Sequence, residues 1–347
     1  MIKNEKKWVV WWLWAGLLMI LIQILLGAIT RLTGSGLSIT QWDIIMGTFY
    51  PWSESDWLEK FSLYKQTPQY LKINQGMDLQ DFKYIFFWEY FHRLWARIMG
   101  FCFIIPFAYF SWKGYLNKWI IVRLIVVFLL AVLVASLGWI MVASGLIERP
   151  WVNAFKLSFH LITAIILLCF LLWVILDYSF SKKNRRSLSN DFHWILLVGL
   201  FIQVFLGGIM SGMKAGLVAP TWPDINGHFW ISGLDFEDLN RKDLITNYEN
   251  TPISPLIVQF LHRTWAYLIW CGVLLILIFY YKRNSLIEFK LWRNMFILIS
   301  LQIVVGIITI LSCIGSVPVV YGVIHQLIGI ICVLYSTYVC FRLRIID

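Results

Sequence analysis

Hydrophobic residues of this chain fall into eight long runs separated by polar segments. A transmembrane helix needs about 20 mostly apolar residues, and every run is long enough. Two long polar segments remain, residues 31–83 and 214–254, and neither has the periodicity of a sizeable independent domain. The pattern predicts an all-α integral membrane protein with helices at residues 8–30, 84–112, 119–146, 151–177, 192–213, 255–281, 291–313 and 319–341.

The composition agrees with this class. Of the 347 residues, 60% are hydrophobic and 14% are charged, whereas a soluble chain has about 45–50% apolar and about 25% charged residues. The chain is therefore not an ordinary soluble enzyme, a disordered tail or a nucleic-acid-binding module. Aromatic residues make up 17%, and Trp and Tyr collect where helices leave the hydrocarbon.

The distribution of charge predicts the orientation. One side of the predicted helices carries 16 Lys and Arg with five acids, and the other carries 10 with 13 acids. Basic residues concentrate in cytoplasmic loops, so we expect both termini inside and segments 31–83 and 214–254 outside. The start of the chain lacks the features of a transit peptide or a cleaved signal. We therefore expect a retained first helix in a bacterial inner (cytoplasmic) membrane.

The chain contains an internal repeat. A constant shift of 180 between residues 23–47 and 203–227 pairs nine identical residues in 25 positions, including Gln23 with Gln203 and Gly27 with Gly207. A shift of 170 then aligns His92-Arg93 with His262-Arg263. Farther along, Gly138 pairs with Gly306, Pro150 with Pro318 and His160 with His325.

The repeat divides the chain into two halves of the same topology. We expect a four-helix bundle over 1–178, a cytoplasmic linker over 179–191 and a second four-helix bundle over 192–347. Four spans per half is an even number, so both halves insert the same way up and form parallel repeats.

Four of the six histidines lie at repeat-equivalent points of predicted helices: His92, His160, His262 and His325. At about 1.5 Å rise per residue, each lies roughly 10–15 Å below the outer surface. Two imidazoles from facing helices can supply both axial ligands of a haem iron, so the pattern favours two haem sites over isolated interhelical hydrogen bonds. Zinc would need Cys or carboxylate ligands as well, and no Cys lies within one helix turn of these histidines. We interpret His193 and His228 as surface histidines.

Charged residues stand beside these histidines. Arg93, Arg97 and Arg263 need anionic partners inside the membrane, and haem propionates would provide them; the alternative is that they reach lipid phosphates. Glu89 lies one turn before His92, while its repeat equivalent is the neutral Gln259. Glu89 is therefore a candidate acid/base or electrostatic group of one site only, or the partner of Arg93 or Arg97 in a salt bridge.

The residues Glu89-Tyr-Phe-His92-Arg93, the second Phe-Leu-His262-Arg263, the lone His160 and His325, and the string Thr30-Arg-Leu-Thr-Gly-Ser-Gly-Leu-Ser38 resemble the haem A synthase family. Tyr64-Lys-Gln-Thr-Pro68 and Phe82-Lys83-Tyr-Ile-Phe86 are similar to the branch found in mitochondria and many Gram-negative bacteria. The likeness covers nearly the whole chain.

This resemblance implies an oxidoreductase that converts haem O to haem A for cytochrome c oxidase. Two successive hydroxylations of a ring methyl, followed by loss of water, would give the formyl group. His92 and His160 would flank the haem O substrate, with Glu89 needed for turnover. His262 and His325 would ligate a permanently bound haem B.

The resemblance also implies partners: haem O synthase as the supplier of substrate, and an electron carrier. The oligomeric state is left open, a homo-oligomer included. Some branches of the family carry a cysteine pair in the first outer loop, but segment 31–83 has no Cys. We interpret Leu37–Trp52 and Leu217–Trp230 as caps over the haem edges.

Two rival functions compete with the enzyme. A dihaem b-type membrane cytochrome would only transfer electrons, and it has less need for a carboxylate in one half alone. A transporter built on parallel repeats would need broken helices at the midplane, which the sequence does not indicate.

Overall fold

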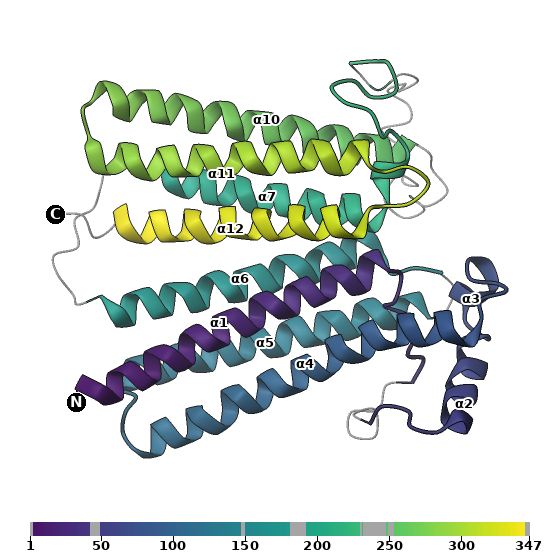
Figure 1. The fold of residues 1–347 in the computed structure, drawn as a ribbon. Helices are drawn as coiled ribbons and strands as arrows, with labels where there is room; N and C mark the ends of the chain where they lie inside the picture. The colour runs from purple at the N-terminus through teal and green to yellow at the C-terminus, as the bar shows by residue number, and fades with distance from the viewer. Residues whose placement is uncertain are drawn as a thin grey trace. The chain divides into compact units, whose positions relative to one another are not determined.

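The computed structural model describes residues 3–41, 49–146, 150–180, 192–229, 231, 248 and 253–343, and these are almost entirely helical (Figure 1). Within them, eight helices are long and apolar enough to cross a membrane, as the sequence predicts. They are α1 (Lys3–Leu32), α4 (Leu79–Trp112), α5 (Lys118–Gly145), α6 (Ala154–Ser179), α7 (Phe192–Gly212), α10 (Ile253–Lys282), α11 (Leu286–Leu311) and α12 (Val319–Leu343).

Helix boundaries follow local capping chemistry as well as hydropathy. Helix α4 begins at Leu79, five residues before the predicted start at residue 84, because Asp78 caps it. The Asp78 carboxylate accepts a hydrogen bond from the backbone N–H of Asp81 at 2.8 Å, which satisfies one of the free amide groups at the helix start. Asn117 and Asn153 cap α5 and α6 in the same way.

The chain packs into two compact units, one of residues 1–156 with 163–181 and one of residues 157–162 with 182–347. The segment Leu157–Ile162 of α6 thus packs with the second unit. The division into functional halves at residues 1–178 and 192–347 stays a prediction. Residues 181–191 of the expected linker lie outside the described residues.

The second unit is a ring of four helices. Helix α7 packs on α10, α10 on α11 and α11 on α12, and α12 closes the ring by packing on α7. Trp265 on α10 donates its indole N–H to the carbonyl of Gly199 on α7 at 2.8 Å, and Trp270 donates to Ser300 on α11 at 3.0 Å.

The first unit uses the same kind of contact between its helices. Trp95 on α4 donates its indole N–H to the carbonyl of Met19 on α1 at 3.0 Å. Near the other end of these helices, Trp12 donates to the carbonyl of Cys102 at 2.9 Å. Arg123 on α5 and Asp177 on α6 form an ion pair at 3.1 Å.

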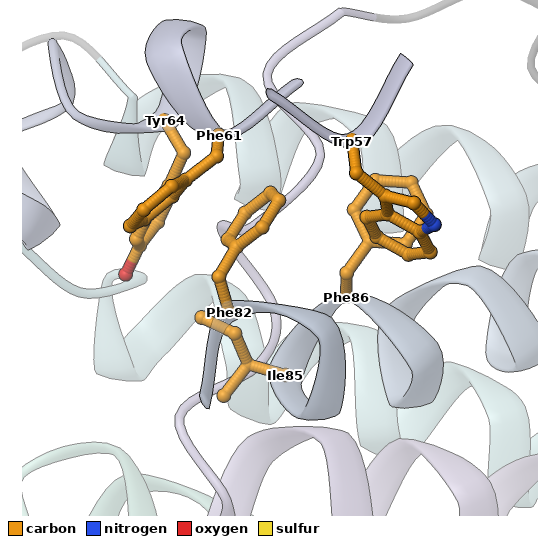
Figure 2. Close-up of a cluster of buried hydrophobic side chains, with 6 residues drawn as sticks. All are labelled: Trp57, Phe61, Tyr64, Phe82, Ile85 and Phe86. Atoms are coloured by element: carbon orange, nitrogen blue, oxygen red, sulfur yellow. The ribbon is translucent and has the colours of Figure 1, made fainter. Parts of the chain in front are cut away.

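Segment 31–83 is more structured than its sequence suggests. It contains two short helices, α2 (Glu54–Tyr64) and α3 (Pro68–Lys72). Side chains of α2 pack on the first turns of α4 and form an aromatic cluster of Trp57, Phe61, Tyr64, Phe82, Ile85 and Phe86 (Figure 2). Packing against α4 thus supplies the apolar burial that α2 lacks as an isolated element.

Polar contacts tie this aromatic cluster to the loop after α1. The Tyr64 hydroxyl donates to Gln69 Oε1 at 3.2 Å and accepts from Asn74 Nδ2 at 2.7 Å. Gln69 in turn donates to the carbonyl of Gly34 at 2.8 Å. Burial of the phenol raises the pKa of Tyr64 to about 12, so the hydroxyl remains a donor across the physiological range.

Candidate functional site

His262 on α10 and His325 on α12 face each other inside the second unit. Their ring centroids are 6.4 Å apart and the ring planes are inclined by 68°. Both rings are partly accessible within the helix bundle. The structure therefore brings together the two histidines that the sequence assigns to one haem site.

Glycine residues make room for these imidazoles on the neighbouring helices. A Cβ atom added to Gly306 on α11 would lie 2.9 Å from His325 Cε1, and one added to Gly207 on α7 would lie 3.2 Å from His262 Cε1. In the first unit, a Cβ on Gly27 would likewise lie 3.2 Å from His92 Cε1. Each of these three histidines thus lies directly against the backbone of another helix.

Glutamine side chains contact the same three histidines. Gln203 Nε2 lies 3.3 and 3.2 Å from the two ring nitrogens of His262 and donates to its carbonyl at 3.1 Å. Gln23 makes the matching contacts with His92 at 3.3, 3.3 and 3.1 Å. Gln302 Nε2 lies 3.3 Å from His325 Nε2.

These glutamines and glycines were not among the predicted site residues, although the sequence carries a signal for them. Gln23 with Gln203 and Gly27 with Gly207 are identities of the repeat. They lie four residues apart, which places both on one helix face. When the same residues recur at matching positions of helices that pack against predicted ligand histidines, they are candidates for positioning those histidines.

The second unit fits a group held by two imidazoles. With ring centroids 6.4 Å apart, His262 and His325 are the residues that would hold a metal group between their rings. Among the described residues, His325 Nδ1 is buried without a hydrogen-bond partner, as are the Oε1 atoms of Gln203 and Gln302. Polar atoms left in this state need a partner.

His92 and His160 lie in different units of the structure. His92 lies on α4, against α1. His160 lies in the segment Leu157–Ile162, where the Ser158 hydroxyl donates to the carbonyl of Phe205 at 2.6 Å. The pairing of His92 with His160 therefore stays a prediction.

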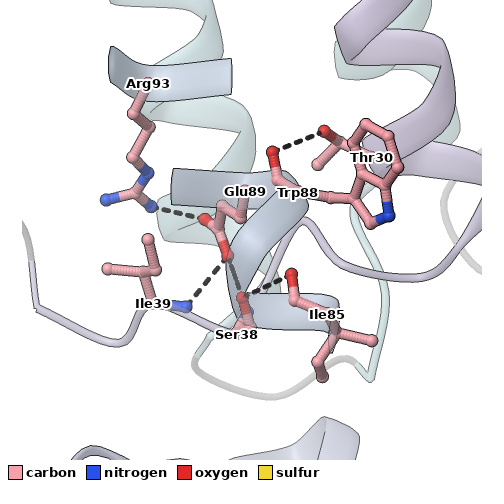
Figure 3. Close-up of polar contacts among 7 residues, drawn as sticks. All are labelled: Thr30, Ser38, Ile39, Ile85, Trp88, Glu89 and Arg93. Atoms are coloured by element: carbon pink, nitrogen blue, oxygen red, sulfur yellow. Dashed lines mark hydrogen bonds and ion pairs between the residues drawn. The ribbon is translucent and has the colours of Figure 1, made fainter. Parts of the chain in front are cut away.

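Glu89 is almost completely buried, with 2% of its surface exposed, and it is surrounded by donors (Figure 3). Its Oε1 pairs with Arg93 at 2.6 Å. Its Oε2 accepts from the backbone N–H and the hydroxyl of Ser38, each at 2.7 Å, and from the N–H of Ile39 at 2.9 Å. Of the alternatives that the sequence leaves open, the salt bridge to Arg93 is present.

Gln259 and Arg263, which align with Glu89 and Arg93 in the sequence, contact the long loop after α7 differently. Gln259 donates to the carbonyl of Ala219 at 2.8 Å. Arg263 donates to the carbonyls of Thr221 at 2.7 Å, Asp224 at 2.9 Å and Ala219 at 3.3 Å. These bonds use three of the five guanidinium donors. Arg97 lies one turn beyond Arg93 on α4 and is partly buried.

The two remaining histidines differ from each other. His228 is exposed in the loop after α7, whereas His193 is buried at the start of α7, with 6% exposure. The interpretation of His193 as a surface residue is therefore wrong. The start of α7 packs against α12, where Cys340 donates to the His193 carbonyl at 3.5 Å.

The predicted caps over the haem edges, Leu37–Trp52 and Leu217–Trp230, lie only partly within the described residues. Residues 42–48 and 230 lie outside the described residues. The described parts contribute Ser38 and Ile39 to Glu89, and Ala219, Thr221 and Asp224 to Gln259 and Arg263. Both long loops thus contact the helix turn that precedes or includes a candidate ligand histidine.

Eight apolar helices and a facing pair of histidines define a polytopic membrane protein of the class that can hold a metal group between helices. Comparison with known proteins narrows this class. Residues 10–337 match the family model described as cytochrome oxidase assembly protein, and the chain belongs to that family.

Curated relatives span nearly the whole chain. A protein named heme A synthase from Pelagibacter ubique is 38% identical over 342 residues, covering 96% of each chain. Proteins of the same name from Flavobacterium johnsoniae and Flavobacterium psychrophilum are 36% and 38% identical, covering 98% of this chain and 99% of theirs.

Proposed function

We propose that this protein is a haem A synthase, an oxidoreductase that oxidises a ring methyl of haem O to the formyl group of haem A. Full-length similarity to relatives of that name carries the proposal. The facing pair of His262 and His325 supports it independently, because two imidazoles on membrane helices could hold a haem.

The second unit is proposed to hold haem B between His262 and His325. The 6.4 Å separation of the ring centroids supports this assignment, because both imidazoles could contact a group bound between them. When bound, haem B would supply one-electron transfer. Gln203 and Gln302 would orient the two rings, and Gly207 and Gly306 would leave room for them.

Haem O is proposed to bind in the first half as the substrate, with His92 and His160 as ligands to its iron. Arg93 and Arg97 are proposed to lie near the propionates of haem O, and Arg263 near those of haem B, because guanidinium groups match carboxylates. Glu89 is proposed as a residue required for turnover. Two hydroxylations of the same methyl carbon, followed by loss of water, would give the formyl group.

We place the protein in the bacterial inner membrane, with both termini cytoplasmic and both long loops outside. The excess of basic residues on one side supports this orientation. Haem O synthase is the proposed supplier of substrate, because haem O is too hydrophobic to diffuse freely in water. A membrane or soluble electron carrier would remove or supply electrons.

Extraction and chromatography of haems from the purified protein test the function. We expect haem B when the protein is expressed alone, and haem A in addition when haem O synthase is co-expressed. Haem B alone in both cultures would instead favour a dihaem cytochrome that only transfers electrons.

The allocation of the second half has its own test. His262→Ala should abolish bound haem B, and His228→Ala, which changes an exposed histidine of the outer loop, should leave it unchanged. Full haem B content in His262→Ala would show that the cofactor is held elsewhere.

A further inference from the structure

Residues 89 and 259 occupy equivalent places in the two halves, 170 residues apart and one turn before an arginine. One is a carboxylate and the other an amide. The structure offers a reason for this difference that does not involve reaction chemistry: each side chain matches the hydrogen-bonding polarity of the loop backbone in front of it.

In the first unit, the loop presents donors. The N–H groups of Ser38 and Ile39 and the Ser38 hydroxyl all point at Glu89 Oε2, and Arg93 occupies Oε1. A carboxylate can accept all four bonds. A glutamine has one oxygen and one NH₂ group, so either orientation of its amide would turn a donor toward the loop or toward Arg93.

In the second unit, the loop presents acceptors. Gln259 is fully buried, and its NH₂ group reaches the carbonyl of Ala219. Arg263 bonds to the carbonyls of Ala219 and Thr221. A carboxylate at position 259 would place an acceptor against a carbonyl, and it would compete with the loop for Arg263.

We propose that Glu89 is a positioning residue, an anionic anchor that fixes loop residues Gly34–Ile39 across the outer ends of the first-unit helices. Bonds to an ionised acceptor are stronger than neutral ones, and burial shields these from water. The side chain acts on the site through the loop rather than by proton transfer to substrate.

Other contacts show that this loop is held at several points. Leu37 is 2% exposed, and a Cβ atom on Gly145, the last residue of α5, would lie only 2.8 Å from its side chain. Gln69 on α3 donates to the Gly34 carbonyl at 2.8 Å. The loop therefore joins α4 and the end of α5 to the outer aromatic cluster, and Glu89 accepts three of its hydrogen bonds.

The consequence for activity rests on the proposed function. Glu89 lies one turn before His92, the proposed ligand of haem O. A loop anchored there would cover the outer edge of the substrate and keep water from it. Loss of the anchor would lower haem A output by loosening the loop, with the proposed haem B site intact.

Hydrogen exchange of the full-length, detergent-solubilised protein tests the anchor directly. In Glu89→Gln, the amides of Ser38 and Ile39 should exchange at least tenfold faster than in the unmodified protein, because both lose an ionised acceptor. Glu89→Asp, which keeps the charge, should restore part of the protection. If Glu89→Gln fails to fold, Ser38→Ala provides the test. It removes a single hydrogen-bond donor and should give a smaller acceleration of amide exchange in this loop.

Gln259→Glu is the matched control. It should accelerate exchange in residues 221–228 and leave Ser38 and Ile39 unchanged. Unaltered exchange of Ser38 and Ile39 in Glu89→Gln would overturn the proposal, and loss of haem A output with unaltered exchange would assign Glu89 to the reacting atoms instead. Because exchange is measured without turnover, failure of the haem A assay in the unmodified protein would affect only the proposed function.

Discussion

At the scale of single residues, close approach decides where the imidazoles lie. His325 lies against the backbone of α11 at Gly306, and His262 against α7 at Gly207. An alanine Cβ at position 306 would lie 2.9 Å from the His325 ring, so something must shift, whereas one at position 207 would make a tight contact of 3.2 Å with His262. A helical glycine normally costs about 0.5–1 kcal/mol relative to alanine, so glycine is retained here at the expense of helix stability.

Gly306→Ala should therefore lower the haem B content. The new Cβ would lie 2.9 Å from His325 Cε1, and the ring would have to move from its position opposite His262. Gly272→Ala on α10 is the control, since nothing lies within 4 Å of a Cβ there. The ratio of haem B to protein, from absorbance and amino-acid analysis, gives the result; equal ratios in the two variants would contradict the steric argument.

At the scale of elements, packing between short and long helices stabilises the outer segment. Helix α2 has only 11 residues, too few to be stable alone in water. Phe82 stacks on Phe61 with ring centroids 5.0 Å apart and lies 5.1 Å from the ring of Tyr64. The first turns of α4 thus form the surface on which α2 folds.

Phe82→Ala should destabilise this packing by about 3–5 kcal/mol, because Phe82 is fully buried. The measurement is the local free energy of opening of α2, from hydrogen exchange of residues 54–64. Tyr84→Ala removes a neighbouring ring that is 56% exposed and should have little effect. Similar opening energies in both variants would show that the cluster does not stabilise α2.

The turn at residues 221–228 should depend on pH. The N–H of Gly227 donates to the Asp224 carboxylate at 3.0 Å, and this bond, followed by the contact with Thr221, lowers the pKa of Asp224 from its usual 3.8. A carboxylate with a lowered pKa stabilises the fold above its unfolded pKa, and this stabilisation is lost as the pH falls through the folded value. The turn should therefore loosen below about pH 4.

Exchange of the Gly227 amide, compared at each pH with Asp224→Asn, measures this effect. The variant keeps an acceptor but cannot titrate, so the ratio of the two rates should change only at acid pH. A constant ratio down to pH 3 would contradict the assignment.

At the scale of the whole molecule, orientation in the membrane follows from charge. The side assigned to the cytoplasm has 16 basic and five acidic residues, and such asymmetry sets topology during insertion. Membership of the family does not by itself show the orientation, which we infer from the charged loops of this chain.

Labelling of intact spheroplasts with a membrane-impermeant thiol reagent checks the orientation. Gln41→Cys in the outer loop should react, and Lys113→Cys in the turn between α4 and α5 should react only after the membrane is opened. Both positions are exposed, so the contrast reports sidedness. The unmodified chain corrects for its native cysteines, and the reverse pattern would invert the orientation.

The membrane helices and the four candidate histidines could be identified from the sequence because hydropathy and residue spacing depend on local order along the chain, and the internal repeat stays a prediction. The eight helices were predicted within about five residues, since about 20 apolar residues can satisfy their backbone in lipid only as a helix. The candidate ligands His262 and His325 were found because ionisable residues are costly in lipid and are therefore rare there. Helix α2 was missed because its stability comes from Phe82 and Phe86 of α4, and α3 was missed because Tyr70 packs on Phe61 and Tyr64 of α2.

The sequence by itself determined the membrane class, the number of spans and the candidate ligands, because these follow from free energies of transfer and from residue spacing. Only the tertiary structure decided what surrounds them: Gly207 and Gly306 beside the imidazoles, glutamines against the rings, and Glu89 facing the backbone N–H groups of Ser38 and Ile39. Such contacts join residues far apart in the chain. The direction in which a loop backbone presents its donors is fixed by three-dimensional packing, and no pattern of residue types records it.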